Sequence, residues 1–316
     1  NLNINILYFT NILQSFFFTN YQLNRYINES RYKENKIFLI TGNMCILFMH
    51  IGENDSSSDY KLILASNRDE LYDRPAMNIS PWKEDPMVIG GRDLEAGCDG
   101  GTWLAISPWR KKIGVLLNLP RTQNANAKTR GKIVADYVKS EISTNDYIQH
   151  QMAYTKECNG FVFIAIEFGT GVLLVNETDQ VKTWSDTCLG FSNSQPETPL
   201  KKVTAGKEKL EEICQRLKRT EFQKELVSEL LKFLKDEQKN LPDPELEKNR
   251  PGTYQQLSSI FVRIPEFRYG TRTHTILLVT KRGKVSVVEA TMEAPIDVCN
   301  PRWQTKELEF ELCGKL

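Results

Sequence analysis

The order of apolar patterns along this chain is the feature that most restricts its fold. Short apolar runs of strand length come first, a helical pattern follows at about 205–237, and more strand-length runs come after it. In the helical pattern, Leu and Ile recur at three-, four- and five-residue steps with Glu and Lys on the other face, which predicts one or two helices packed on a sheet. A partner-binding helix would show the same pattern. Strands, then helices, then strands are typical of an α+β protein. Strands are expected at 45–51, 60–66, 87–89, 101–107, 112–117, 160–167, 171–176, 257–264, 274–280, 284–290 and 306–312, with a shorter helix at 131–142 and a loop at 241–253.

Charge excludes several classes of partner. The 316 residues carry 41 Lys and Arg against 40 Asp and Glu, a formal net charge of +1. The basic pairs Lys111-Lys112 and Lys201-Lys202 are short and far apart, so they form no stripe for nucleic acid or for an anionic membrane. These lysines are expected on the solvated surface. No run reaches the roughly 18 apolar residues that a transmembrane segment needs.

Cysteine usage indicates a reducing compartment. The chain has seven Cys, an odd number, and no Cys-x-x-Cys pair. Its three His residues, His50, His150 and His274, stand far apart in the sequence. Structural metal sites usually draw their ligands from closely spaced pairs. The sequence therefore predicts free thiols, a cytoplasmic location and no metal centre.

The first 43 residues differ in composition from the rest of the chain. They include nine Asn and contain no Ala, Val, Pro or Asp. One interpretation is untranslated sequence, with translation beginning at Met44. The other is a targeting segment, for which Arg25 and Arg31 favour a mitochondrial presequence and the neighbouring acids oppose one. The domain prediction is an atypical extension at 1–43 and a single domain at 44–316.

A thiol is expected beside a charged turn. The strands 45–51 and 60–66 can form a hairpin, which would bring Cys45 next to the segment Asn67-Arg68-Asp69. A guanidinium near a thiol lowers the pKa of the thiol, so a reactive Cys45 is predicted. If Met44 is the initiator and is removed, Cys45 also gains a free α-amine that can act as its base.

The glycine-rich segment 90–101 has two interpretations. It lacks the Lys-Ser/Thr of a P-loop and the spacing of a dinucleotide site, which favours a tight structural loop. The alternative is that Arg68, Arg74 and Arg92 converge on an anionic group, such as the phosphates of coenzyme A, because arginine suits phosphate recognition.

Four short motifs follow one another along the chain. They are Asn67-Arg68-Asp69-Glu70, Gly90-Gly91-Arg92-Asp93, Gly100-Gly101-Thr102-Trp103 and Tyr269-Gly270-Thr271-Arg272. Together they resemble the transport and Golgi organisation 2 family, known for its Asn-Arg-Asp-Glu motif, from Met44 to about the C-terminus. The resemblance implies the fold of the N-terminal nucleophile hydrolases, a four-layer αββα sandwich of two mainly antiparallel sheets.

Through the cysteine branch of that fold, the resemblance also implies residue roles. Cys45 matches the nucleophile, Asp69 the acid that orients its α-amine, and Asn193 the side-chain donor of an oxyanion hole. Ligand binding is assigned to Asn67, Arg68, Asp69, Glu70, Arg92, Asn118 and Arg272. The structural alternative is that Arg68 and Asp69 pair with neighbours around a turn and that Asn118 and Asn193 satisfy loop backbone.

Two functions of different classes follow from this resemblance. The first is non-enzymatic handling of acyl-CoA, lipid or haem-type ligands, in lipid homeostasis, protein secretion and Golgi organisation, in the cytoplasm with mitochondrial and Golgi association. The second is a cysteine amidohydrolase or thioesterase that acts on acyl substrates. We favour the first, with no required cofactor. If haem is the ligand, its axial ligand is expected among Cys45, His50 and His274.

Overall fold

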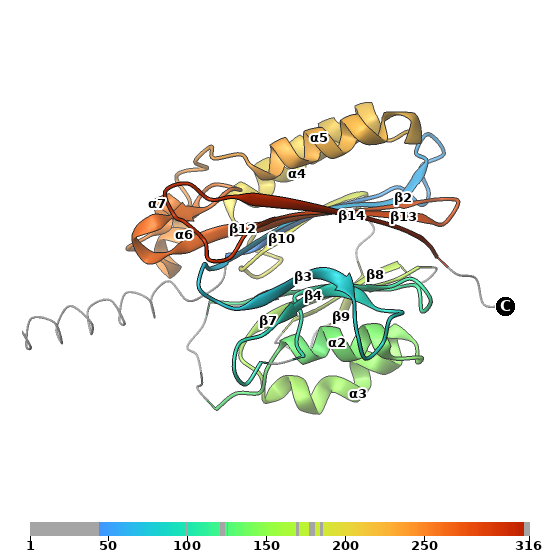
Figure 1. Cartoon of the computed structure of the whole chain (residues 1–316), viewed down its shortest axis with the longest axis horizontal. Coiled ribbons are helices and arrows are strands. Elements are labelled where there is room, and N and C mark those ends of the chain that lie inside the picture. Colours follow the sequence, from blue (N-terminus) through green and yellow to red (C-terminus); the bar gives the residue numbers. More distant parts are fainter. Residues whose placement is uncertain are drawn as a thin grey trace, which may run out of the picture. The chain divides into compact units, whose positions relative to one another are not determined.

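Two antiparallel β-sheets form the centre of the described chain (Figure 1). The computed structural model describes residues 44–312 except 99, 121–123, 125, 169–170, 177–180 and 184–185, and residues 171–176 by their backbone. The predicted extension at 1–43 and Cys313 lie outside the described residues. The α+β class with two antiparallel sheets is confirmed.

The first sheet contains the Asn67–Glu70 motif near its middle. Its strand order is β10 (Cys188–Ser192), β1 (Ile46–Ile51), β2 (Tyr60–Leu71), β12 (Tyr269–Thr280), β13 (Lys284–Met292) and β14 (Trp303–Glu311), with β11 (Arg263–Ile264) paired to β12. The predicted hairpin is confirmed, because β1 and β2 pair antiparallel with Ile46 opposite Asn67. All of these pairings are antiparallel, and strands from both ends of the described chain meet in this sheet.

The second sheet is a meander built from the middle of the chain. Its order is β3 (Ala76–Pro81), β4 (Ile89–Asp93), β5 (Leu104–Ser107), β6 (Lys112–Asn118), β7 (Phe161–Glu167), β8 (Gly171–Asn176) and β9 (Val181–Thr183). Each strand pairs with the next strand in the chain, so most of the ladder forms from local hairpins.

A hydrophobic core joins the two sheets. Alternate residues of β1 and β2, such as Leu47 and Leu64, point to this core because successive strand side chains face opposite sides. Ile106 and Ile113 of the second sheet belong to the same cluster. The outward positions of β1 carry a separate aromatic contact, in which Phe48 packs on Phe233 with ring centroids 4.9 Å apart.

The helices pack on the outward faces of the sheets. α4 (Lys201–Leu217) contacts β1 and β10, and α5 (Gln223–Leu234) contacts β2 and β12. α2 (Gly131–Lys139) packs on β5 and β6, and α3 (Thr144–Lys156) on β7. The prediction of one or two sheet-covering helices at 205–237 is therefore confirmed, with the first helix beginning earlier. No helix in the described ranges is both long and apolar enough to cross a membrane.

Three expected elements differ from the structure. Residues 67–71 continue β2 and do not form a turn, because they pair with the start of β12. The segment 257–264 is mostly irregular, and only Arg263–Ile264 pairs as β11. Ile260 and Val262 are buried although they lie outside any strand. The expected loop at 241–253 contains α6 (Pro244–Asn249), which Asp243 caps by accepting a 3.0 Å hydrogen bond from Leu246 N–H; α7 (Tyr254–Leu257) follows.

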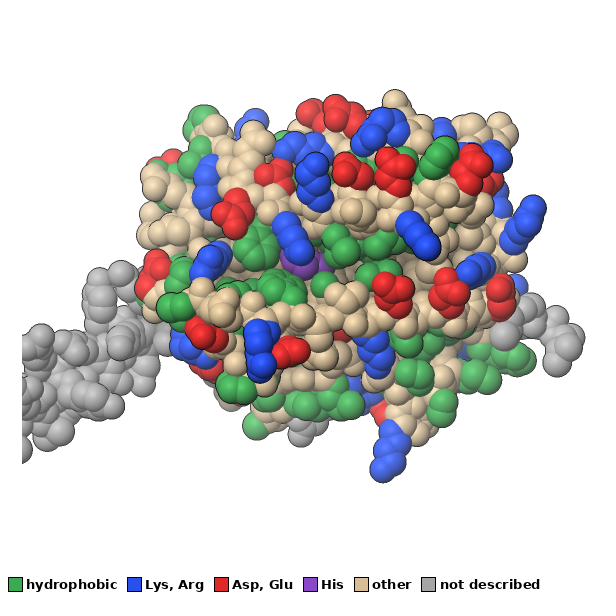
Figure 2. All heavy atoms as spheres, turned by 45° about the horizontal axis from the view of Figure 1, so that its top comes forward, with side chains coloured by type: hydrophobic (Ala, Val, Ile, Leu, Met, Phe, Trp, Pro, Cys, Tyr) green, Lys and Arg blue, Asp and Glu red, His purple; other side chains and the backbone are tan. Residues whose placement is uncertain are grey.

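Acidic and basic side chains are interspersed on the face shown in Figure 2. The view turns the helix side of the first sheet forward, and no continuous basic patch is visible on this face. Mixed charge of this kind gives no strong single-sign field.

Candidate functional site

Three predicted site residues lie side by side on adjacent strands. Ile46 of β1 pairs with Ser192 on one neighbouring strand and with Asn67 on the other. Extending this antiparallel register by one residue places Cys45 opposite Asn193 and Arg68. Cys45 belongs to the core between the sheets, and the Arg68 guanidinium lies 4.0 Å over the Trp103 ring at the edge of that core. The Asn193 side-chain amide donates to the backbone carbonyl of Asn118 in the second sheet. The structure thus brings Cys45, Arg68, Asn118 and Asn193 together between the sheets.

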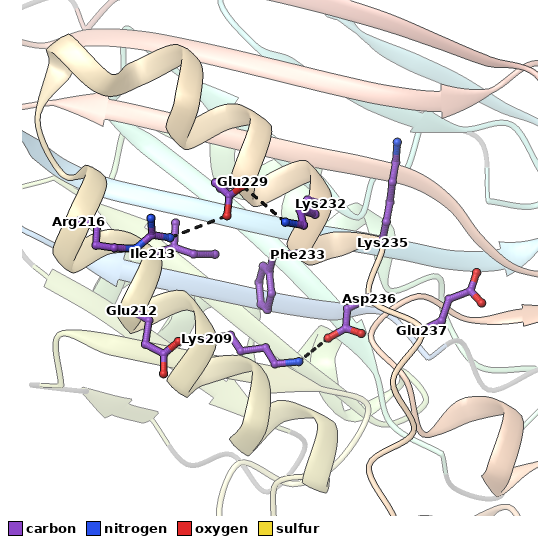
Figure 3. Close-up of a pocket in the computed structure, with 10 residues that line it drawn as sticks. All are labelled: Lys209, Glu212, Ile213, Arg216, Glu229, Lys232, Phe233, Lys235, Asp236 and Glu237. Atoms are coloured by element: carbon purple, nitrogen blue, oxygen red, sulfur yellow. Dashed lines mark hydrogen bonds and ion pairs between the residues drawn. The ribbon is translucent and has the colours of Figure 1, made fainter.

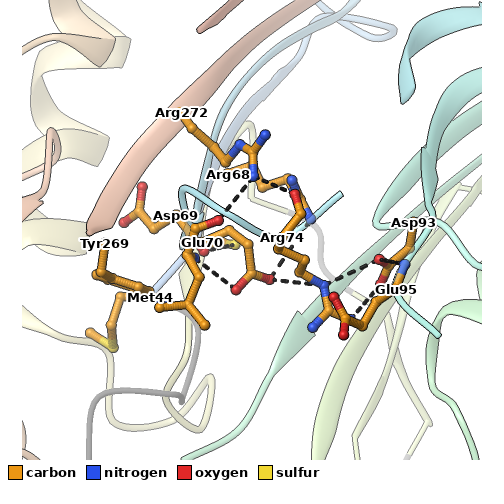
Figure 4. A network of polar contacts seen from close by, with 11 residues as sticks. Met44, Arg68, Asp69, Glu70, Arg74, Asp93, Glu95, Tyr269 and Arg272 are labelled. Atoms are coloured by element: carbon orange, nitrogen blue, oxygen red, sulfur yellow. Dashed lines mark hydrogen bonds and ion pairs between the residues drawn. The ribbon is translucent and has the colours of Figure 1, made fainter. Parts of the chain in front are cut away.

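A cluster of guanidinium and carboxylate groups continues from this row (Figure 4). Glu70 lies 3.7 Å from Arg68 and 3.5 Å from Arg74. Arg272 donates to the carbonyls of Leu71 and Arg74 at 2.9 and 2.6 Å, and its buried Nε has no partner. Burial and the nearby Arg68 charge lower the pKa of Arg272 to about 10. The cluster therefore gathers three guanidinium groups around the Glu70 carboxylate.

The Cys45 thiol has a raised pKa, not the lowered pKa predicted from the sequence. Burial raises it from 9.0 to about 12, the Asp69 carboxylate adds to this, and the lowering effect of Arg68 is smaller. The Sγ atom contacts the Asp69 backbone carbonyl at 3.7 Å. The prediction was wrong because it counted the guanidinium and not the loss of water around the thiol.

The four residues of the Asn-Arg-Asp-Glu motif are divided between the two faces of β2. Figure 4 shows Asp69 and Glu70 pointing to opposite sides of the strand. Arg68 and Glu70 serve the cluster between the sheets, whereas Asn67 and Asp69 face the helices. This division follows from the strand conformation, since neighbouring side chains alternate.

Asn67 connects the sheet to the helix layer. Its Nδ2 donates to the carbonyls of Leu234 and Ile260 at 2.8 and 3.0 Å, so its Oδ1 must accept from His274 Nδ1, 2.6 Å away. His274 therefore carries its proton on Nδ1, and its buried Nε2 has no partner. The His274 ring stacks on Trp303 at 4.8 Å, and burial lowers its pKa to about 3, which keeps it neutral. These contacts hold the end of α5 on the sheet.

Lys202 is a buried charge that the sequence reasoning placed on the surface. Its side chain is 0% exposed, and its Nζ donates to the Ser259 carbonyl at 3.2 Å. Lys112 is also buried, at 2% exposed, and donates to Ser140 and Ile142. The burial of Lys202 could have been predicted from helical spacing, because Lys202, Gly206 and Leu210 recur every four residues and lie on the buried side of α4.

The other residues that were predicted to bind a ligand lie outside the cluster around Arg68. Arg92 pairs with Glu84 and stacks on Trp82 at 4.2 Å, apart from the Arg68 contacts described above. His50 lies opposite Cys188 on the helix side of β1. Among the described residues, no group of three or more His, Cys, Asp or Glu is arranged to hold a metal ion.

A groove lies between α4 and α5 (Figure 3), and Cys45 is not among its lining residues. It has a volume of about 530 Å³, and most of its lining side chains are charged. Lys209 pairs with Asp236 at 2.5 Å and Arg216 with Glu229 at 3.8 Å, so these charges largely satisfy one another. Its polar lining does not suit an acyl chain.

Comparison with known proteins assigns the family. A model of the family described as Transport and Golgi organisation 2 matches residues 44–294. The chain is 37% identical over 262 residues to Transport and Golgi organization protein 2 of Drosophila melanogaster, covering 79% of this chain and 92% of the relative. The chain belongs to the transport and Golgi organisation 2 family. Homologues in Mus musculus and Homo sapiens are each 34% identical, and each alignment covers 85% of this chain and 99% of the relative. The family match thus includes the Asn67–Glu70 motif and the residues around Cys45.

Glu289 gives this family member a predicted dependence of stability on pH. Its carboxylate accepts a 2.8 Å hydrogen bond from Ile79 N–H of the second sheet, and burial raises its pKa from 4.5 to about 7. Because the folded state binds this proton more tightly than the unfolded state, the contribution is fully present below about pH 4.5 and is lost as pH rises to about 7.

As the pH rises from about 4.5 to about 7, we therefore expect the free energy of unfolding of Glu289→Gln to fall by about 3 kcal/mol less than that of the wild type. Gln keeps the acceptor for Ile79 and removes the charge. Urea denaturation at both ends of the range measures the difference, with exposed Glu307→Gln as the matched control. Parallel pH profiles of wild type and Glu289→Gln would contradict the prediction.

Proposed function

We propose that this chain is a non-enzymatic carrier of ligands that combine an acyl chain with an anionic group, with acyl-CoA as the first candidate. The observation that carries the proposal is the pair Arg68 and Arg272, each only 5% exposed, at the polar end of an apolar core. Buried guanidinium groups need anionic partners, and the Glu70 carboxylate, which lies 3.7 Å from Arg68 and 3.5 Å from Arg74, also interacts with Arg272 and is therefore shared among three guanidinium groups. The relatives are named for transport and Golgi organisation, and we propose lipid handling in support of secretion, in the cytoplasm with Golgi and mitochondrial association.

The alternative is a cysteine amidohydrolase or thioesterase. Cys45 and the Asn193 amide occupy neighbouring positions, as nucleophile and oxyanion donor must, and Asp69 Oδ2 has no donor at present. A free α-amine at Cys45 would supply both a base and a partner for Asp69. Under this alternative the fold is that of the N-terminal nucleophile hydrolases, a four-layer αββα sandwich, which we propose for either function.

Native mass spectrometry with palmitoyl-CoA separates these functions when protein expressed from Met44, in which removal of the initiator exposes the Cys45 α-amine, is measured beside the full chain. A carrier retains intact palmitoyl-CoA, also as Cys45→Ala, whereas a hydrolase gives an acyl adduct on Cys45 with free coenzyme A. For the carrier, Arg68→Met with Arg272→Met is expected to weaken retention at least about tenfold, because two charge-assisted contacts are lost. Arg110→Met, a change in a distant surface pair with Glu141, is the matched control.

Two further arms test the remaining ligand assignments. Arg92→Glu that leaves palmitoyl-CoA affinity unchanged would remove Arg92 from the ligand set. Haem is the other candidate ligand. A Soret band that survives the combined substitution of Cys45, His50 and His274 would exclude all three as axial ligands.

A further inference from the structure

Arg130 is a cation that neither proposed function uses. It stands immediately before α2, and its guanidinium donates a 2.9 Å hydrogen bond to the Gly160 carbonyl. Among the described residues, this neutral carbonyl is the only hydrogen-bond partner of the guanidinium, and α2 has no acid in its first turn. Burial lowers the pKa of Arg130 from 12.5 to about 10. A partly buried cation at the positive end of a helix is unfavourable unless an anion binds it.

Hydrogen bonds place Arg130 at the contact that joins the two sheets near Asn118. The Gly160 carbonyl that Arg130 contacts also accepts a 2.9 Å hydrogen bond from Leu119 N–H. Leu119 directly follows Asn118, whose carbonyl accepts from the Asn193 side-chain amide of the first sheet. The Arg130 guanidinium therefore lies at the same end of the second sheet as the Asn118–Asn193 contact.

A second set of contacts connects the backbone beside Arg130 to the guanidinium cluster. Gly131 packs so closely on Gly101 that a Cβ added to Gly131 would lie 3.0 Å from Gly101 Cα. The Gly101 carbonyl accepts a 2.9 Å hydrogen bond from Asp93 N–H, and the Asp93 carboxylate pairs with Arg74 at 2.7 Å. The start of α2 and the cluster shown in Figure 4 thus meet at one end of the two sheets.

Two guanidinium groups of this region lack a carboxylate of their own. Arg272 shares the Glu70 carboxylate with two other guanidinium groups, and its Nε, in a side chain only 5% exposed, has no partner. Arg130 has the Gly160 carbonyl described above. A carboxylate supplies one negative charge, whereas a phosphate monoester supplies about 1.5 to 2 at pH 7 and presents three acceptor oxygens. A phosphate or pyrophosphate group can therefore bind both guanidinium groups.

We propose that Arg130 is a further ligand-binding residue and that it selects a phosphate-bearing acyl ligand over a free fatty acid. The proposal rests on the carrier function proposed above, and it adds a residue beside the second sheet to Arg68 and Arg272 of the first sheet. Phosphate oxygens contact guanidinium groups on both sheets. A fatty acid carboxylate is held by Arg68 and Arg272 alone and gains nothing from Arg130.

Native mass spectrometry of the full chain with palmitoyl-CoA and, separately, with palmitate tests this selection. Arg130→Met is expected to weaken palmitoyl-CoA retention at least about tenfold, because charge-assisted hydrogen bonds are lost, and to change palmitate retention less than about twofold. Arg130→Gln can still donate to the Gly160 carbonyl but has no charge, so it should show the same selective loss; it carries the test if Arg130→Met does not fold. Lys128→Met is the matched control and should change neither retention, because it removes a neighbouring cation that already pairs with Glu157 at 2.8 Å.

Inorganic pyrophosphate, which has no acyl chain, separates failure of this proposal from failure of the carrier function. Pyrophosphate is expected to raise the thermal unfolding midpoint of the wild type and not that of Arg130→Gln. If this difference is found but the wild type retains no palmitoyl-CoA, the phosphate-binding role of Arg130 stands and the carrier function is overturned. Equal palmitoyl-CoA retention by the wild type and Arg130→Gln, or an equal loss of palmitate and palmitoyl-CoA, would overturn the role of Arg130 and leave the carrier function in place. Binding of neither palmitoyl-CoA nor pyrophosphate would overturn both.

Discussion

Asn67→Ala is expected to lower the free energy of unfolding by about 3–5 kcal/mol. Asn67 is 0% exposed and has three buried partners, the carbonyls of Leu234 and Ile260 and the Nδ1–H of His274. Leu234 is the last residue of α5, and its carbonyl has no partner within the helix. Alanine would leave all three groups unsatisfied and away from water, which costs more than a lost surface hydrogen bond.

Urea denaturation of the wild type and Asn67→Ala measures this effect. Asn126→Ala, at an exposed position, is the matched control and should change the stability by less than about 0.5 kcal/mol. A loss below about 1 kcal/mol for Asn67→Ala would show that Asn67 does not hold the helix layer. A ligand-binding role alone would lower affinity for the ligand and leave the stability of the free protein unchanged.

Gly206→Val is expected to destabilise the protein by about 3 kcal/mol or more. Gly206 lies where α4 crosses β1, and a Cβ at this position would overlap the ring of Phe48. Phe48 is 0% exposed and is held between the helices by Phe233, so its ring cannot move into solvent. The helix must therefore move away from the sheet, which exposes apolar surface along both elements.

A second-site change tests this explanation of the Gly206 effect. Phe48→Leu shortens the side chain that the new methyl groups would meet, so the Gly206→Val, Phe48→Leu double variant should recover about half of the lost stability. Gly252→Val, where an added Cβ meets nothing within 4 Å, is the matched control. Additive losses in the double variant would show that the Phe48 contact is not the cause.

The Asn67 prediction gives the family motif a structural as well as a chemical role. Asn67 stabilises the attachment of the helices, and Asp69 accepts a hydrogen bond from the Thr271 hydroxyl on the same side of β2. Arg68 and Glu70 belong to the charged cluster between the sheets. If a substitution in this motif abolishes function, the free energy of unfolding of that variant must therefore be measured as well, to separate a loss of stability from a loss of chemistry.

Local pattern by itself determined the α+β class, the hairpin of β1 and β2, and a helical segment at about 205–237, which the structure divides into α4 and α5. These follow from apolar periodicity, which each segment carries in its own sequence. It did not show that residues 67–71 extend β2, because their partners, which lie within 269–274 of β12, are about 200 positions away in the chain. Whether a polar segment forms a strand depends on the strand that pairs with it, and the local sequence does not contain that information.

The candidate site divides in the same way. The predicted hairpin placed Cys45 beside Arg68, the family resemblance added Asn193, and the strand register brings all three together. Only the tertiary structure decided that Lys202 is buried, that Asn67 holds α5, and that the pKa of Cys45 is raised. The reason is desolvation: the effect of a charge depends on how much water the packed chain leaves around it, and residue spacing alone does not contain that information.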